Sequence, residues 1–198
     1  MTLKEYDLPF HTFMGGWQTD DKVIDDMMNY YNLNKANAIP GHSYDPELKK
    51  SSIKKEYKES YDLSVNCEAN YWPITSYLNL LGECTKKYLE KYTAANEHLY
   101  SWSIVENFNI QRYPIGGGFK EWHCERPNPS KLNRILVFMT YLNSCDGGTE
   151  FKNQDITIPA TKGLTLIWPS DWTHIHKGIV SHTSEKYIVT GWFGFTDY

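Results

Sequence analysis

Between Gln111 and Phe195 the chain contains, in order, the stretches His123-Cys124-Glu125, Asp171-Trp172-Thr173-His174-Ile175-His176 and Lys186-Tyr187-Ile188-Val189-Thr190-Gly191-Trp192. Imidazole and carboxylate groups are common ligands of transition metals. On a β-strand, residues i and i+2 point to the same side, so His123 and Glu125 can reach one ion while Cys124 faces away. The first stretch therefore predicts two ligands of a metal site.

A third ligand is expected from the second stretch, where two histidines qualify. His174 and His176 have the same parity, so both can face inward from one strand. Two apolar runs, Ile135–Leu142 and Leu164–Trp168, separate them from His123 and indicate strands. Two histidines and one carboxylate that converge from separate strands form the facial triad of non-heme Fe(II) sites, which leaves other coordination positions open.

Each of these residues also has an ordinary structural explanation. A histidine on a strand is more often a hydrogen-bonded core or surface residue than a ligand. Glu125 can instead pair with Arg126 or Arg134, and an exposed lysine such as Lys186 is common at the start of a strand. A hydrolytic zinc site also uses two histidines and one glutamate. The wider pattern of the C-terminal half is needed to choose among these explanations.

Further features follow in order along the chain: Tyr113 before His123, Tyr141-Leu142-Asn143, Gly147-Gly148-Thr149-Glu150-Phe151, Lys186 ten residues after His176, and Trp192. With them the C-terminal half resembles the 2-oxoglutarate and Fe(II)-dependent oxygenases, most closely the prolyl 4-hydroxylase-like branch. A basic residue follows the distal histidine of that family by nine or ten positions, which favours His176 over His174. The departure is Glu125, where most of the branch has aspartate. The longer side chain places the ion further from its strand.

The resemblance implies a mainly β fold with flanking helices: a double-stranded β-helix, or jelly roll, with an N-terminal helical layer. It also implies a site for the cosubstrate 2-oxoglutarate, formed by Lys186, Tyr113, Tyr141, Thr190 and Trp192. A dicarboxylate that chelates iron at one end needs a cation for its far carboxylate, which would be costly to bury unpaired. We expect Lys186 to supply this cation, with Tyr113 and Tyr141 as hydroxyl donors.

Strand parity supports this placement. The side chains of Lys186, Ile188, Thr190 and Trp192 alternate onto one face of their strand, so the lysine can point into the barrel. On the preceding apolar run, Ile135, Val137, Met139 and Tyr141 are expected to share a face. The two faces together predict a dry pocket beside the metal.

The activity implied by the resemblance is hydroxylation with O2, coupled to decarboxylation of 2-oxoglutarate to succinate and CO2. No catalytic side chain is expected beyond the three ligands, because the metal carries the chemistry, and ascorbate is included as a reductant. The favoured substrate is a peptidyl residue, proline first. The alternatives are hydroxylation of a free amino acid or other small molecule, and a non-catalytic jelly-roll module that binds metal.

Composition and charge disfavour other classes of function. The 198 residues carry a net charge of −4 without a long basic run, so there is no electrostatic basis for binding nucleic acid or an anionic membrane. The start of the chain lacks a basic region followed by an apolar one, and no apolar run is long enough to span a bilayer, so a cytoplasmic protein is expected. The four cysteines show no Cys-x-x-Cys pattern, which predicts free thiols.

We predict one domain over residues 1–198, in which residues 1–100 provide helical support and a loop and residues 101–198 provide the core strands with the metal site. Apolar spacing predicts a helix capped by Thr19-Asp20-Asp21 that runs to Tyr31, and a second helix from about Ile74 to Ala94 that begins after Pro73. The polar stretch between Asn32 and Ser60 predicts a long loop.

Overall fold

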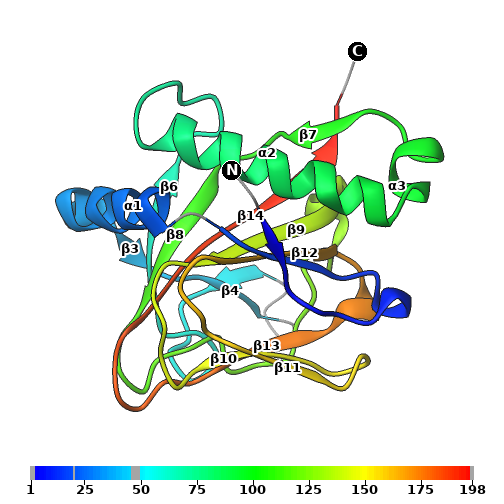
Figure 1. The fold of residues 1–198 in the computed structure, drawn as a ribbon. Coiled ribbons are helices and arrows are strands. Elements are labelled where there is room, and N and C mark those ends of the chain that lie inside the picture. Colours follow the sequence, from blue (N-terminus) through cyan, green and yellow to red (C-terminus); the bar gives the residue numbers. More distant parts are fainter. Residues whose placement is uncertain (1–2, 20, 46–49, 197–198) are drawn as a thin grey trace.

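The fold consists mainly of antiparallel β-sheets with helices on one side. The computed structural model describes residues 3–19, 21–45 and 50–196. Figure 1 shows helices α1 (Asp21–Asn34) and α2 (Ile74–Lys91) across one face of the large sheet, with a smaller sheet on the other side. This arrangement confirms the predicted double-stranded β-helix with a helical layer. That residues 1–198 form one domain stays a prediction.

The large sheet joins strands from both halves of the chain. Nine of the described strands form it, in the order β1-β2-β12-β9-β14-β8-β6-β3 with β7 beside β14. Their bounds are β1 (Lys4–Glu5), β2 (Gly15–Gln18), β3 (Ile39–Pro40), β6 (Tyr61–Val65), β7 (Trp102–Ile104), β8 (Phe108–Tyr113), β9 (Arg134–Tyr141), β12 (Leu164–Pro169) and β14 (Lys186–Phe195).

The second sheet has the order β11-β10-β13, and a separate pair consists of β4 and β5. These strands are β10 (Gly148–Phe151), β11 (Ile156–Pro159), β13 (His176–Ile179), β4 (Ser43–Asp45) and β5 (Lys50–Ser52). The remaining helical elements are α3 (Ala94–Glu97) and the short 3-10 helices η1 (Phe10–Thr12), η2 (Lys35–Asn37), η3 (Pro129–Lys131) and η4 (Trp172–His174). Among the described residues no helix is both long and apolar enough to cross a lipid bilayer.

Alternating side chains of the large sheet divide the interior into two cores. Every residue of β9 is buried. Leu136 and Phe138 pack in the core beneath the helices, whereas Val137, Met139 and Tyr141 pack in the core between the two sheets. β14 lies between β9 and β8, so one of its faces also borders the space between the sheets. This space is where the functional side chains gather.

The helices are confirmed, with shifted ends. The first begins at Asp21 and continues to Asn34 rather than Tyr31, and the second ends at Lys91, before Ala94 begins a separate short helix. Asp20, which we placed in the cap of the first helix, lies outside the described residues. The hydroxyl of Thr19 does not cap that helix and instead donates to the carbonyl of Gly163, 2.6 Å away.

The stretch predicted as a long loop contains regular structure. Within its described part, α1 extends to Asn34 and is followed by η2, β3, β4 and β5. β3 adds to the edge of the large sheet through β6. A polar sequence hid these strands because short edge strands need few apolar residues. All four cysteines of the chain are free thiols, as predicted.

β9 has one irregularity, at Ile135. Phe193 of β14 pairs with Leu136, and the next residue, Gly194, pairs with Arg134, so Ile135 is an extra residue on β9. Such a bulge shifts the alternation by one and redirects the side chain beyond it. The prediction that Ile135 shares the cavity-side face of this strand is therefore wrong, because Ile135 packs in the core beneath the helices. Arg134 turns to the opposite side.

Gly191 in the middle of β14 is expected to tolerate no side chain. A Cβ there would lie 2.4 Å from Cζ of Phe138 and 2.6 Å from Cβ of Phe108, both fully buried. We expect Gly191→Ala to lower the free energy of unfolding by about 1–3 kcal/mol through overpacking, measured by urea denaturation. The matched variant Gly82→Ala, on an open face of α2 with nothing within 4 Å, should instead raise it by about 0.5–1 kcal/mol. Equal stability of the two variants would contradict this packing.

Candidate active site

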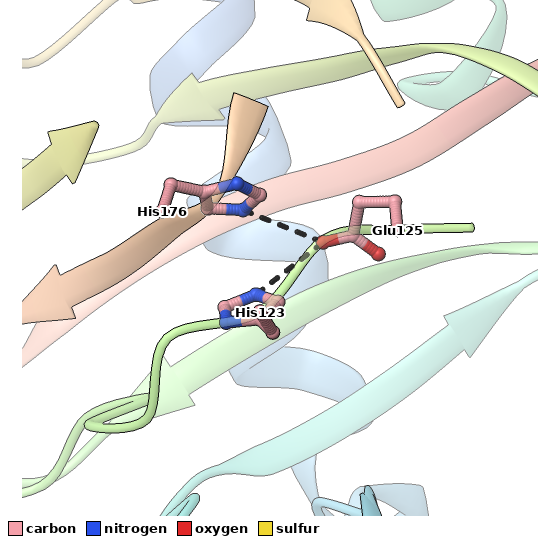
Figure 2. A group of neighbouring side chains, drawn as sticks. All are labelled: His123, Glu125 and His176. Carbon is pink, nitrogen blue, oxygen red and sulfur yellow. Dashed lines mark ion pairs between the residues drawn. The ribbon is translucent and has the colours of Figure 1, made fainter. Parts of the chain in front are cut away.

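Three side chains predicted as ligands converge on one point. Figure 2 shows His123 and His176 directed at the same carboxylate oxygen of Glu125. Nε2 of each histidine lies 3.5 Å from Oε1 of Glu125. One ligand atom from each residue lies within 4.8 Å of the other two. Two imidazole nitrogens and one carboxylate oxygen at this spacing suit a single transition-metal ion such as non-heme Fe(II).

The local structure that carries the first two ligands differs from the prediction. His123 and Glu125 do not lie on a strand: the segment between β8 and β9 is irregular, and only His123 forms an isolated bridge with His176. The backbones of His123 and His176 exchange hydrogen bonds of 3.0 and 2.9 Å. The amide of Glu125 then donates to the carbonyl of Ser170 at 3.1 Å. Pairing with β13 and the end of β12 therefore aligns both ligands without a regular strand.

Backbone carbonyls orient both imidazole rings. Nδ1 of His123 lies 2.9 Å from the carbonyl oxygen of Glu121, and Nδ1 of His176 lies 2.9 Å from that of His174. A carbonyl can only accept, so each Nδ1 carries the proton and each Nε2 keeps a lone pair for a metal. Burial, with help from the neighbouring His176, lowers the pKa of His123 and favours its neutral form. This is the protonation state that metal binding requires.

The carboxylate of Glu125 is ionised and held on both sides. Burial opposes ionisation, but the interactions with the adjacent imidazoles of His123 and His176 outweigh it and hold the pKa of this carboxyl well below its ordinary value. On the other oxygen, Oε2, the indole Nε1 of Trp192 donates at 2.9 Å and Nη1 of Arg134 lies at 3.4 Å. Of the two arginines considered as structural partners of Glu125, Arg134 is therefore in contact.

The second arginine, Arg126, pairs with Asp171. His174, the other candidate for the third ligand, lies in η4 rather than on a strand and points away from the convergence point. Its Nε2 lies 2.8 Å from the carbonyl oxygen of Thr12, and its Nδ1 lies 2.9 Å from the hydroxyl of Thr173. Both ring nitrogens are thus occupied, and Nε2 attaches the N-terminal segment.

A cavity of about 960 Å³ extends from the three convergent residues between the two sheets. Its wall includes all five residues predicted for the cosubstrate: Lys186, Tyr113, Tyr141, Thr190 and Trp192. The alternation along β14 therefore places its predicted face toward the cavity. Met139 and Ile188 add apolar surface between these polar groups, as in a pocket that excludes water.

Lys186 is buried, and no carboxylate of the described residues pairs with it. It is 3% exposed, and its ammonium donates to the carbonyls of Ile179 at 2.8 Å and Gly148 at 3.1 Å. The ring of Tyr113 lies 5.2 Å from Nζ. Burial lowers the pKa of Lys186 to about 8, so the side chain is still charged at pH 7. A buried cation that meets only neutral groups is suited to an anion that enters the cavity.

The two tyrosines differ in how their hydroxyl protons are used. Tyr113 donates to Oε1 of Gln111 at 2.6 Å, and Gln111 donates in turn to Asp62 at 3.2 Å. Asp62 also pairs with the buried Lys58 at 2.7 Å. The hydroxyl of Tyr141 lies 2.7 Å from that of Thr149, and either can be the donor. Burial raises the pKa of both tyrosines, which keeps them protonated.

Thr190 and Trp192 also have partners already. Thr190 donates to the carbonyl of Phe138 on the neighbouring strand at 3.3 Å. The indole N–H of Trp192 is used by Glu125, so this residue, predicted beside the cosubstrate, contacts the candidate metal ligand itself. Cosubstrate binding by these five residues stays a prediction.

Several cavity residues were missed in the sequence. The ring of Phe119 stacks on His123 at 3.5 Å with an angle of 8° between the planes, and Trp168 packs edge to face against His176 at 5.2 Å. Trp168 has the parity of Leu164 and Leu166, so its direction could have been found by counting along the strand. Phe119 follows a glycine run without periodicity, and no local signal marks it.

Comparison with known proteins is informative for both the site and the fold. Residues 108–194 match the family model of the 2OG-Fe(II) oxygenase superfamily. No curated protein matches the chain.

Solved structures with a similar fold include a Pseudomonas putida prolyl-4-hydroxylase, with 11% identity, 94% of both chains covered and a TM-score of 0.68. A Trichoplax adhaerens prolyl hydroxylase in complex with a hypoxia inducible factor oxygen degradation domain peptide fragment has 16% identity, 92% and 84% coverage and a TM-score of 0.68. The Paramecium Bursaria Chlorella virus-1 collagen prolyl hydroxylase has 14% identity, 98% and 96% coverage and a TM-score of 0.64. At these identities the likeness shows the fold.

The family match spans the candidate ligands and most of the cavity wall. His123, Glu125, His176 and Lys186 all lie within residues 108–194, and so do strands β8, β9 and β12 and all but the last residue of β14. Two imidazoles and an ionised carboxylate fit Fe(II), and the buried ammonium fits a dicarboxylate. The segment that carries the three convergent side chains and the buried lysine, residues 108–194, is therefore similar to the 2OG-Fe(II) oxygenase superfamily.

Proposed function

We propose that this oxygenase hydroxylates a peptidyl residue, with proline as the first candidate, using Fe(II) held by His123, Glu125 and His176. The observation that supports the proposal most directly is the pairing of this cluster with Lys186 in one cavity. A structural metal would not require a buried ammonium whose hydrogen-bond partners, among the described residues, are two backbone carbonyls. A cosubstrate with a distal carboxylate does require it.

Fe(II), when bound, supplies the chemistry: activation of O2 coupled to oxidative decarboxylation of 2-oxoglutarate. The balanced reaction converts a substrate C–H bond, O2 and 2-oxoglutarate into a C–OH group, succinate and CO2. The chain contributes binding and orientation. Lys186 pairs with the distal carboxylate. Tyr141 can also donate to this carboxylate when the hydroxyl of Thr149 supplies the proton of the bond between the two hydroxyls. Met139 and Ile188 keep the pocket dry.

The cavity favours a peptide over a free amino acid. Its volume of about 960 Å³ far exceeds that of a short dicarboxylate, and its lining includes Tyr57, Trp122 and the segment 127–131. A free amino acid would need partners for its own ammonium and carboxylate groups. Among the described lining residues, the buried cation Arg134 is already paired with Glu106 and Glu125. The peptide-bound prolyl hydroxylase of similar fold offers a precedent for a peptide in this kind of cavity.

The proposal is tested with Fe(II)-loaded protein, 2-oxoglutarate and O2. Substrates are proline-containing peptides, matched peptides with alanine at each proline, and the free amino acids. We expect succinate and a mass gain of one oxygen atom with the proline peptides only. If only free amino acids are turned over, the substrate is a small molecule and the proposed peptidyl substrate is wrong. If anaerobic Fe(II) and 2-oxoglutarate give no visible charge-transfer band, and O2 then gives no succinate, the proposed enzymatic function is wrong.

Ascorbate as reductant and a cytoplasmic location stay predictions.

A further inference from the structure

Glu125 is longer than an aspartate by one methylene, so its carboxylate needs more support to hold one position. We propose that Arg134 and Trp192 are positioning residues that bind one oxygen of this carboxylate, Oε2, and thereby direct the other, Oε1, to the metal. The inference rests on the proposed function, because it requires a metal held by the triad. It assigns to Trp192 a role different from the cosubstrate contact predicted from the sequence.

The two carboxylate oxygens of Glu125 have separate partners. Both histidine Nε2 atoms lie 3.5 Å from Oε1. The Trp192 indole at 2.9 Å and the Arg134 guanidinium at 3.4 Å approach Oε2. Arg134 also donates to the backbone carbonyl of Glu125 at 3.2 Å. In Figure 2 both dashed lines end on one oxygen, while the other oxygen points away from the histidines. This division predicts that Glu125 offers one oxygen to the ion.

Arg134 and Trp192 hold each other in place. The guanidinium carbon lies 3.3 Å from the centre of the Trp192 ring, so the cation stacks on the indole whose N–H edge reaches Glu125. Stacking of this kind is a property of arginine that lysine does not reproduce. The bulge at Ile135 is what turns Arg134 to this side of β9. Both positioning residues are therefore placed by the sheet rather than by a flexible loop.

Glu106 keeps Arg134 from neutralising the ligand. Its two oxygens accept from Nε and Nη2 of Arg134 at 2.6 and 2.8 Å, a bidentate pair shorter than the contact with Glu125. Short bidentate pairs are the stronger interaction. Most of the arginine charge is thus balanced by Glu106, and the negative charge of Glu125 remains available to a cation. Groups behind metal ligands commonly orient them in this way.

The first test measures Co(II) affinity without O2 or 2-oxoglutarate, through the visible d–d absorption of the bound ion. Trp192→Phe removes the N–H and keeps a ring under Arg134, and we expect Co(II) to bind about 10- to 100-fold more weakly. We also expect a changed absorption spectrum, because a released Oε2 can join the coordination. The matched control is Trp102→Phe, which loses an indole hydrogen bond to the carbonyl of Ala95 in the core beneath the helices and should keep the affinity and spectrum of the unchanged protein.

A second pair of variants tests the arginine. Arg134→Gln should weaken Co(II) binding to a similar extent, whereas Arg112→Gln, which breaks the ion pair with Glu185, should not. If Arg134→Gln fails to fold, as judged by circular dichroism, Trp192→Phe still decides the question. Unchanged Co(II) affinity and spectrum in folded Trp192→Phe would overturn the proposal.

A double-mutant cycle separates positioning from general weakening. Glu125→Asp withdraws the carboxylate from Trp192, so it removes the same contact as Trp192→Phe. We therefore expect the double variant to bind Co(II) about as weakly as the weaker of the two single variants. Losses that multiply would show independent effects and contradict the inference. Failure of the unchanged protein to bind Co(II) or Fe(II) would instead refute the proposed function, so the two failures are distinguishable.

Discussion

Replacing Lys186 by methionine is expected to weaken 2-oxoglutarate binding by about 30-fold or more while leaving metal binding intact. The estimate follows from the cost of removing one partner of a buried, hydrogen-bonded charge pair. Titration calorimetry of 2-oxoglutarate into Mn(II)-loaded protein without O2 measures it. If Lys186→Met binds 2-oxoglutarate as tightly as the unchanged protein, Lys186 has been misassigned.

The same variant should make the metal-free protein more stable at pH 7. Burial lowers the pKa of Lys186 from its ordinary value of 10.5 to about 8, so keeping the ammonium charged in the folded state costs on the order of 3 kcal/mol. Loss of the hydrogen bonds to Gly148 and Ile179 offsets part of the gain. We expect the free energy of unfolding to rise by about 1–2 kcal/mol, measured with urea.

The pH dependence of this effect has a definite sign. Between pH 8 and 10.5 the unfolded chain holds the Lys186 proton and the folded chain releases it. The free energy of unfolding of the unchanged protein should therefore rise with pH in this window relative to that of Lys186→Met, and the difference between the two free energies should close. Lys87→Met, at an exposed position of α2, should stay within about 0.5 kcal/mol of the unchanged protein. A gap that widens with pH would contradict the assignment.

Replacing His176 by alanine is expected to abolish stabilisation by metal, whereas replacing His174 is not. A metal present at 100 times its Kd adds about 2.7 kcal/mol to the folded state, which raises Tm by about 5–10 °C in a chain of this size. Thermal unfolding with and without Mn(II) measures this increment. His176→Ala should lose it, because one of the three convergent ligands is gone.

His174→Ala should lower Tm without metal, since the bond to the carbonyl of Thr12 is lost, and yet retain the Mn(II) increment. His182→Ala changes an exposed turn and serves as the matched control, with neither effect expected. A His174→Ala protein that loses the increment, alongside a His176→Ala protein that keeps it, would reverse the choice of third ligand.

Several parts of the site could be predicted because they follow from periodicity. The face of β14 that carries Lys186 and Thr190 was found by counting alternate residues, since a strand places every second side chain on one side. The apolar strands β9 and β12 were located within one residue at each end. The same counting gave the right direction for His123 and Glu125 on wrong grounds, because their segment is irregular and is aligned by the bridge to His176.

The sequence by itself determined the chemistry available to this protein: two histidines, a glutamate and a lysine. These residues lie on or beside apolar strands, and the alternation along the strands directs every second side chain inward. The spacing to Lys186 favoured His176 in the sequence, but only the tertiary structure brought His176 to the cluster and His174 to Thr12, because strand parity is the same for both histidines. It also decided that Arg134 reaches Glu125, through a bulge at Ile135. Periodicity is a local property of the chain, whereas a bulge and a bridge between distant segments arise only when strands pair.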